Sequence, residues 1–102
     1  MGIKKQYLKS RDICKVTLTL PKEQAKTAKK VMLVGDFNGW DVEATPMQKL
    51  KNGSFKTNLS LTKGNEYQFR YLLDSNRWEN ELEADKYVSN GYSGDNNSVV
   101  II

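Results

Sequence analysis

Histidine is absent from this sequence of 102 residues, and cysteine occurs only once. Without histidine or a second thiol the chain lacks the usual ligands of a structural zinc site, and Cys14 has no internal disulfide partner. No apolar run approaches the about 18 residues of a membrane span, and residues 1–6 lack the apolar segment of a secretory signal. We therefore expect a cytoplasmic protein of one domain, with no metal, cofactor or membrane contact.

Carboxylates are scarce in the first 30 residues, where nine basic side chains stand against two acidic ones. The whole chain carries a net charge of +4. The basic residues are spread over an expected tail, a strand and a loop, which is typical of a solvated surface. We therefore expect no nucleic-acid partner.

Apolar and polar residues alternate with a period of two in several segments, as is typical of half-buried β-strands. The longest such segments are residues 14–20, 55–61 and 67–73. Cys14 has the parity of the apolar residues in its segment, so its side chain is expected to face the core. Shorter strands are predicted at residues 31–34 and 99–102, and more weakly at 47–50, 77–81 and 87–89.

Helix signals are weak. Residues 21–30 contain Ala25 and Ala28 but no apolar stripe, so we expect a loop with at most one helical turn. Short strands separated by Gly, Asn and Pro predict an all-β, antiparallel β-sandwich. We place this domain at residues 13–102, after a flexible N-terminal arm at residues 1–12.

Trp40 follows the dipeptide Asn38-Gly39, which favours a tight turn because both residue types tolerate positive φ. We expect this turn to present the indole on the surface as a stacking platform. The alternative is that Trp40 caps one end of the core, since tryptophan is highly buried on average.

A series of acidic residues alternates near the C-terminus: Glu79, Glu81, Glu83 and Asp85. Residues spaced by two share one face, whereas the two carboxylates of a glycosidase flank the scissile bond. We interpret the series as a solvated edge that discourages sheet aggregation. Because histidine is absent and the only cysteine is expected to be buried, we do not expect an enzyme.

The segment from Val31 to Trp40, with the sequence VMLVGDFNGW, resembles the opening of glycogen-binding modules of the isoamylase N-terminal, or early set, type. Such modules belong to carbohydrate-binding module family 48 and accompany branching and debranching enzymes and the β-subunit of AMP-activated protein kinase. Small stand-alone bacterial proteins consist of little else. The similarity continues through Thr45-Pro46-Met47, the Asn52-Gly53 hairpin, residues 67–74, Trp78 and residues 95–100. The resemblance implies an immunoglobulin-like β-sandwich.

The resemblance also implies a set of site residues. In members that bind glucan, two tryptophans stack on glucose rings, and the matching positions here are Trp40 and Trp78. A basic residue and an asparagine that hydrogen-bond sugar hydroxyls match Arg70 and Asn96, and a bulky supporting residue matches Tyr92. Arg70 also has the outward parity of its strand, where it can meet a ligand without burying an unpaired charge.

Three functional hypotheses follow. The first is non-catalytic binding of α-1,4-glucan, such as glycogen, starch or a maltooligosaccharide, with a glycogen-metabolising enzyme or another protein as a further partner. The second is a protein-interaction module of the same fold that uses Trp40 and Trp78 as anchors without binding sugar. The third is binding of single-stranded nucleic acid, which must weaken steeply with salt, whereas binding of a neutral glucan must not.

Overall fold

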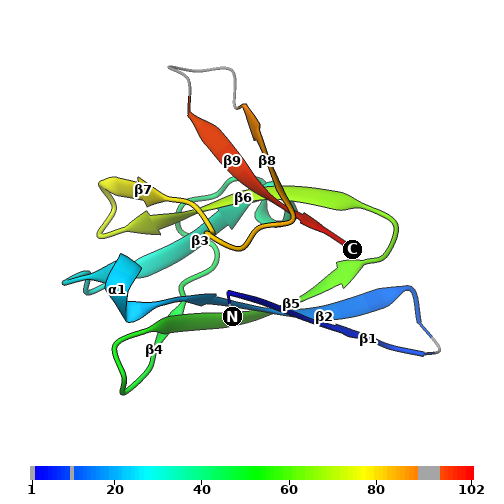
Figure 1. Ribbon diagram of the computed structural model, residues 1–102, viewed down its shortest axis with the longest axis horizontal. Helices are drawn as coiled ribbons and strands as arrows, with labels where there is room; N and C mark the ends of the chain where they lie inside the picture. The colour runs from blue at the N-terminus through cyan, green and yellow to red at the C-terminus, as the bar shows by residue number, and fades with distance from the viewer. Residues whose placement is uncertain (1, 10, 90–94) are drawn as a thin grey trace.

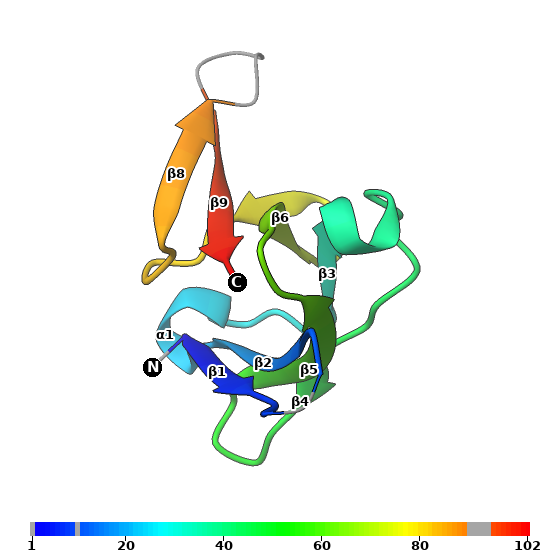
Figure 2. The same cartoon turned by 90° about the vertical axis from the view of Figure 1, so that its right-hand side faces the viewer.

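The computed structural model describes residues 2–9, 11–89 and 95–102. This part of the chain forms two antiparallel β-sheets that face each other (Figures 1 and 2). The β2 sheet has the strand order β1-β2-β5-β4. The β6 sheet has the order β3-β6-β9-β8, and β7 pairs with β6. The expected all-β antiparallel sandwich is therefore confirmed.

The strands lie where the sequence predicts them, with one addition near the N-terminus. They are β1 (Ile3–Tyr7), β2 (Ile13–Leu20), β3 (Val31–Gly35), β4 (Gln48–Lys49), β5 (Phe55–Thr62), β6 (Glu66–Leu73), β7 (Arg77–Glu79), β8 (Lys86–Ser89) and β9 (Asn96–Ile101). A single helical turn, α1 (Lys22–Ala25), interrupts the expected loop, and a 3-10 turn, η1 (Asp36–Asn38), follows β3. No helix in the described ranges is long and apolar enough to cross a membrane.

The core lies between the two sheets and is built from alternating residues of the long strands. Cys14 is fully buried on β2, as predicted from its parity. From the β6 sheet, Phe69 and Tyr71 enter the core with their ring centroids 5.8 Å apart in an edge-to-face contact, a favoured aromatic geometry. Burial of each such large side chain contributes about 1.5–3 kcal/mol.

The expectation of a flexible arm over residues 1–12 is wrong for residues 3–7. These residues form β1, which pairs with β2 from Ile3 opposite Leu18 to Tyr7 opposite Cys14. Of the β1 side chains, only Ile3 packs against the core. An edge strand with so little apolar surface gives no hydrophobic alternation, so its long-range pairing leaves no local signal.

The interpretation of the acidic series as a solvated edge is wrong for Glu81, which is 2% exposed. Its Oε1 accepts a hydrogen bond from the Tyr71 hydroxyl at 2.7 Å, and its Oε2 accepts one from the Glu83 backbone N–H at 3.0 Å. Glu79 pairs in register with core-facing Tyr71, and Glu81 shares its parity, so this side of the acidic series is the inner side of the sheet. Burial, the charge of Glu81 and this hydrogen bond raise the pKa of the Tyr71 hydroxyl well above its ordinary value.

Candidate functional site

The outer face of the β6 sheet carries a small apolar cluster that is separate from the core. Met32 and Val34 of β3 and Leu72 of β6 form it, and Trp40 packs against it. Met32 pairs in register with Leu72, and Val34 with Arg70, so these side chains share one side of the sheet. The cluster gives the outer face an apolar floor.

The turn that carries Trp40 is held by Asn38. Its Oδ1 accepts a hydrogen bond from the Gly35 backbone N–H at 3.1 Å, and its Nδ2 donates to the Leu33 carbonyl at 2.8 Å. The Trp40 backbone N–H donates to the Gly35 carbonyl at 2.9 Å. Positive φ falls on Gly39 (68°) and Trp40 (61°), and not on Asn38, so Asn38 and Gly39 are not the two central residues of a type I′ turn. The indole lies partly buried on the outer face, outside the core between the sheets.

Asp36 fixes the indole of Trp40 relative to β6. Its Oδ1 accepts a hydrogen bond from Trp40 Nε1 at 2.8 Å, while its Oδ2 accepts one from the Gln68 backbone N–H at 2.8 Å. β3 ends at Gly35, opposite Phe69. The Asp36 carboxylate therefore accepts the hydrogen bond of the Gln68 backbone N–H, which has no β3 residue opposite it. One side chain therefore satisfies a strand donor and orients an aromatic ring.

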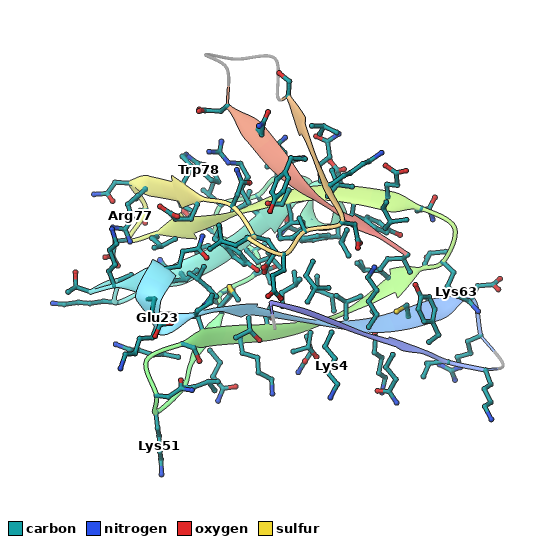
Figure 3. All side chains as sticks on the ribbon, in the orientation of Figure 1. Lys4, Glu23, Lys51, Lys63, Arg77 and Trp78 are labelled. Atoms are coloured by element: carbon teal, nitrogen blue, oxygen red, sulfur yellow. The ribbon has the colours of Figure 1, made fainter. Side chains whose placement is uncertain are left out.

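Trp78 lies on the other side of β6 from β3. It belongs to β7, pairs in register with Leu72, and is 40% exposed; Figure 3 shows it projecting outward. The guanidinium carbon of Arg70 lies 5.3 Å from the centroid of the Trp78 ring, within the range of a cation–π contact. Arg70 Nε is shielded from solvent and has no hydrogen-bond partner among the described residues.

The segment around α1 holds β7 and its tryptophan in place. Gln24 Nε2 donates to Glu79 Oε1 at 3.1 Å, and Arg77 Nη2 donates to the Ala25 carbonyl at 3.3 Å. At the β6–β7 turn, Asp74 Oδ1 accepts hydrogen bonds from the backbone N–H groups of residues 29 and 30, which lower the pKa of its carboxyl group. Trp78 therefore rests on a hairpin that is tied down at both its turn and its far end.

The asparagines of β9 divide between the two faces of the sheet. Asn97 has outward parity, and its Nδ2 donates to Gln68 Oε1 at 3.0 Å, next to Arg70 in the strand. Asn97 is only 7% exposed, whereas Asn96 is exposed. Asn96 pairs with Ser89 and shares the parity of Ser98, which lies opposite core-facing Phe69. The alternation of β9 therefore places Asn97 on the same face as Arg70, and Asn96 on the opposite side of the strand.

The structure thus brings three of the five predicted site residues to one face: Trp40, Arg70 and Trp78. Tyr92 lies outside the described residues. Sequence reasoning missed Asp36, Gln68 and Asn97. The parity of Gln68 with Arg70 was a usable signal, because both are outward positions of a clearly alternating strand.

The described residues contain no group of three or more acidic or cysteine side chains that could hold a metal ion. What the outer face does offer is two indole rings, one guanidinium group and a pair of side-chain amides. This set can stack on a flat ligand and hydrogen-bond to its rim, but it holds no nucleophile beside a base.

Comparison with protein-family models identifies the family of this chain. The model of carbohydrate-binding module 48, the isoamylase N-terminal domain, matches residues 15–91, which is more than half of the chain and includes Trp40, Arg70 and Trp78. Comparison with curated proteins gives no match. The chain therefore belongs to the carbohydrate-binding module 48 family, whose early-set, immunoglobulin-like sandwich is the fold described above.

Proposed function

We propose that the outer face of the β6 sheet binds a chain of α-1,4-linked glucose, as in glycogen, starch or a maltooligosaccharide. Membership of the family implies a carbohydrate-binding module for glucan. The observation that carries the finer proposal is the placement of Trp40 and Trp78 on either side of β6, with the Arg70 guanidinium 5.3 Å from the Trp78 ring centroid.

The chemistry of glucose suits this face. The axial C–H bonds of the pyranose ring make its faces apolar, so stacking on an indole removes apolar area from water. The equatorial hydroxyls stay at the rim, where they need both donors and acceptors. Arg70 supplies donors. Among the described residues, the amide of Gln68 has a free donor group and that of Asn97 a free acceptor, since Asn97 is 7% exposed and its Nδ2 already donates to Gln68 Oε1.

Asn96 and Tyr92 remain predictions that rest on the family resemblance. The strand alternation favours Asn97 as the asparagine that faces the sugar. Comparing Asn96→Ser with Asn97→Ser separates the two assignments. If Asn97 contacts the sugar, its replacement lowers the affinity more than the replacement of Asn96 does.

The proposed role is binding without catalysis. Hydrolysis of a glycosidic bond requires two carboxyl groups that flank it. Beside the tryptophans, both oxygens of Asp36 are engaged by Trp40 and Gln68, while Glu81 is buried and bonded to Tyr71. We expect the pure protein to release no reducing sugar from starch, and turnover that disappears in Glu79→Gln or Glu81→Gln would contradict this part of the proposal.

The direct test is calorimetric titration with maltoheptaose. An open stacking face buries little area, so we expect a dissociation constant in the micromolar to millimolar range, that is, roughly −4 to −8 kcal/mol. Trp40→Ala, Trp78→Ala and Arg70→Ala should each weaken binding by about 1–3 kcal/mol. Tyr7→Ala is a matched control, because Tyr7 is an aromatic residue of β1 that is 51% exposed.

Three outcomes would count against the proposal. Cellooligosaccharides, whose extended chain does not match a curved α-glucan, should compete poorly, so equal binding of both sugars contradicts the assignment. If Tyr7→Ala weakens maltoheptaose binding as much as Trp78→Ala does, the sugar does not bind specifically to the outer face of the β6 sheet. A folded protein whose tryptophan fluorescence ignores glucan would favour the protein-interaction module instead.

A further inference from the structure

Within the described part of the chain, the outer face of the β2 sheet carries positive charge, and its strands β1, β2 and β5 contain no carboxylate. Its outward positions on β1, β2 and β5 follow from the register, which aligns Lys4 with Thr17 and Thr17 with Asn58. They are Lys4, Gln6, Ile13, Lys15, Thr17, Thr19, Lys56, Asn58, Ser60 and Thr62. None of these ten is acidic, and no ion pair reaches Lys4, Lys15 or Lys56 within the described residues.

Protection of a sheet edge does not account for these lysines. Lysine on an edge strand discourages edge-to-edge aggregation, and this explains Lys4 on β1. However, Lys15 and Lys56 lie on β2 and β5, which are interior strands of the sheet. An ordinary solvated face also mixes both signs of charge, whereas this one carries only one sign.

A groove of about 400 Å³ lies among these side chains. Its lining includes Lys4, Gln6, Lys15, Thr17, Asn58 and Ser60. Because Gln6 pairs with Lys15, Lys4 and Lys15 are diagonal neighbours across the strands, a spacing of about 7–8 Å that lets two long side chains reach one anion. Thr17 already donates to Asn58 Oδ1 at 2.8 Å, so the floor is a hydrogen-bonded polar surface.

The side chains of this groove select among anionic ligands. Single-stranded nucleic acid needs aromatic rings for its bases, and the ten outward positions contain none. A protein partner needs aromatic, Arg or large apolar anchors, and here these amount to Ile13 at one end of the face and half-buried Leu59 in the groove lining. Ammonium groups beside hydroxyls and amides fit a small ligand that carries both a phosphate group and hydroxyls.

We propose that this groove is a second binding site, specific for a free hexose phosphate. The two ammonium groups of Lys4 and Lys15 bind the phosphate, while Gln6, Asn58 and Ser60 bind sugar hydroxyls. A volume of about 400 Å³ is within the range of small-molecule sites. Lys4 and Trp78 lie on opposite outer faces of the sandwich (Figure 3), so a glucan chain and a hexose phosphate can bind at the same time.

The test is a titration of the isotope-labelled protein with glucose 6-phosphate, followed by backbone amide NMR shifts. We expect saturable shifts confined to β1, β2 and β5. The double variant Lys4→Gln/Lys15→Gln should bind about 10-fold more weakly, because each exposed ion pair contributes modestly. The control Lys29→Gln/Lys51→Gln changes the net charge equally at exposed lysines outside these strands, and should bind as the wild type does.

The same titration with other probes defines what would overturn the proposal. Glucose and inorganic phosphate should each bind more weakly than glucose 6-phosphate, because each lacks half of the recognised chemistry. Equal weakening in both double variants would show a diffuse charge effect and no site. Shifts on the β6 sheet, or tighter binding by polyglutamate or single-stranded DNA, would also overturn it, whereas loss of maltoheptaose binding in Trp78→Ala leaves it intact.

Discussion

Replacing Asp36 by asparagine tests whether an ordered indole is what the proposed glucan site needs. The two carboxylate oxygens of Asp36 accept hydrogen bonds from Trp40 Nε1 and from the Gln68 backbone N–H, both at 2.8 Å. Asparagine supplies one oxygen and one NH₂ group, so one of the two donors must face another donor. We expect the amide oxygen to stay with the strand N–H and the indole to lose its partner.

The expected loss of affinity in Asp36→Asn follows from the conformational freedom that the Trp40 side chain regains. Ordering a mobile side chain on binding costs about 0.5–1.5 kcal/mol, which corresponds to a loss of about 2- to 12-fold in affinity for maltoheptaose. Asp36 is exposed, so the lost hydrogen bond should lower the free energy of unfolding by about 1 kcal/mol or less. The loss of affinity should therefore be measurable in a protein that stays folded.

A double-mutant cycle separates this mechanism from a general effect on the fold. Trp40→Phe keeps an aromatic face but removes the indole N–H, so Asp36→Asn should change the affinity by less than about twofold in that background. Calorimetric titration of the four proteins with maltoheptaose measures the affinity, and urea unfolding measures the free energy of unfolding. An equal loss of affinity in both backgrounds would refute the argument, since Asp36 would then act independently of the indole N–H.

Three further predictions concern the fold. Gly35→Ala should destabilise the protein by several kcal/mol, because a Cβ there would lie 2.6 Å from the Gln68 carbonyl oxygen. Gly39→Ala should cost only about 1 kcal/mol, because Gly39 has a φ of 68° but open space around its Cα. Urea unfolding of the two variants measures the difference. Cys14 should react slowly with thiol reagents until the protein unfolds, and rapid labelling of the native state would contradict its burial. The folded-state pKa of Tyr71 is raised above 10.0. The contribution of its neutral hydroxyl to the free energy of unfolding is therefore complete below pH 10.0 and is lost as the pH rises further. Tyr71→Phe should make the free energy of unfolding fall less steeply with pH in this range.

The long half-buried strands could be predicted from the sequence because each carries its own two-sided pattern. On β2 the buried residues alternate without a break, and this was enough to orient Cys14. The outward position of Arg70 followed in the same way. β1 could not be found like this, since its pairing with β2 depends on a partner that is distant in sequence and not on apolar alternation.

The asparagine assignment shows where local patterns stop being informative. β9 is buried on both sides, with Val99 and Val100 each at most 1% exposed, so the alternation that would reveal its faces is absent. Only the observed registers with β6 and β8 and the hydrogen bond to Gln68 separate Asn97 from Asn96. Glu81 is a similar case, because only the register of β7 with β6, which places Glu79 opposite core-facing Tyr71, shows that the acidic series begins on the inner side.

The conformation of Trp40 connects the fold to the proposed function. A bulky residue with a φ of 61° is uncommon and costs of order 1 kcal/mol or more, and such strain persists only where the surroundings over-determine it. Here Asn38 holds the turn from Gly35, while Asp36 holds the indole itself. Glycine at position 40 would relieve the backbone but would remove the ring that covers Val34 and Leu72. The turn therefore keeps a strained backbone at a residue whose side chain covers the apolar cluster of the outer face, which is the arrangement expected of a preorganised stacking platform.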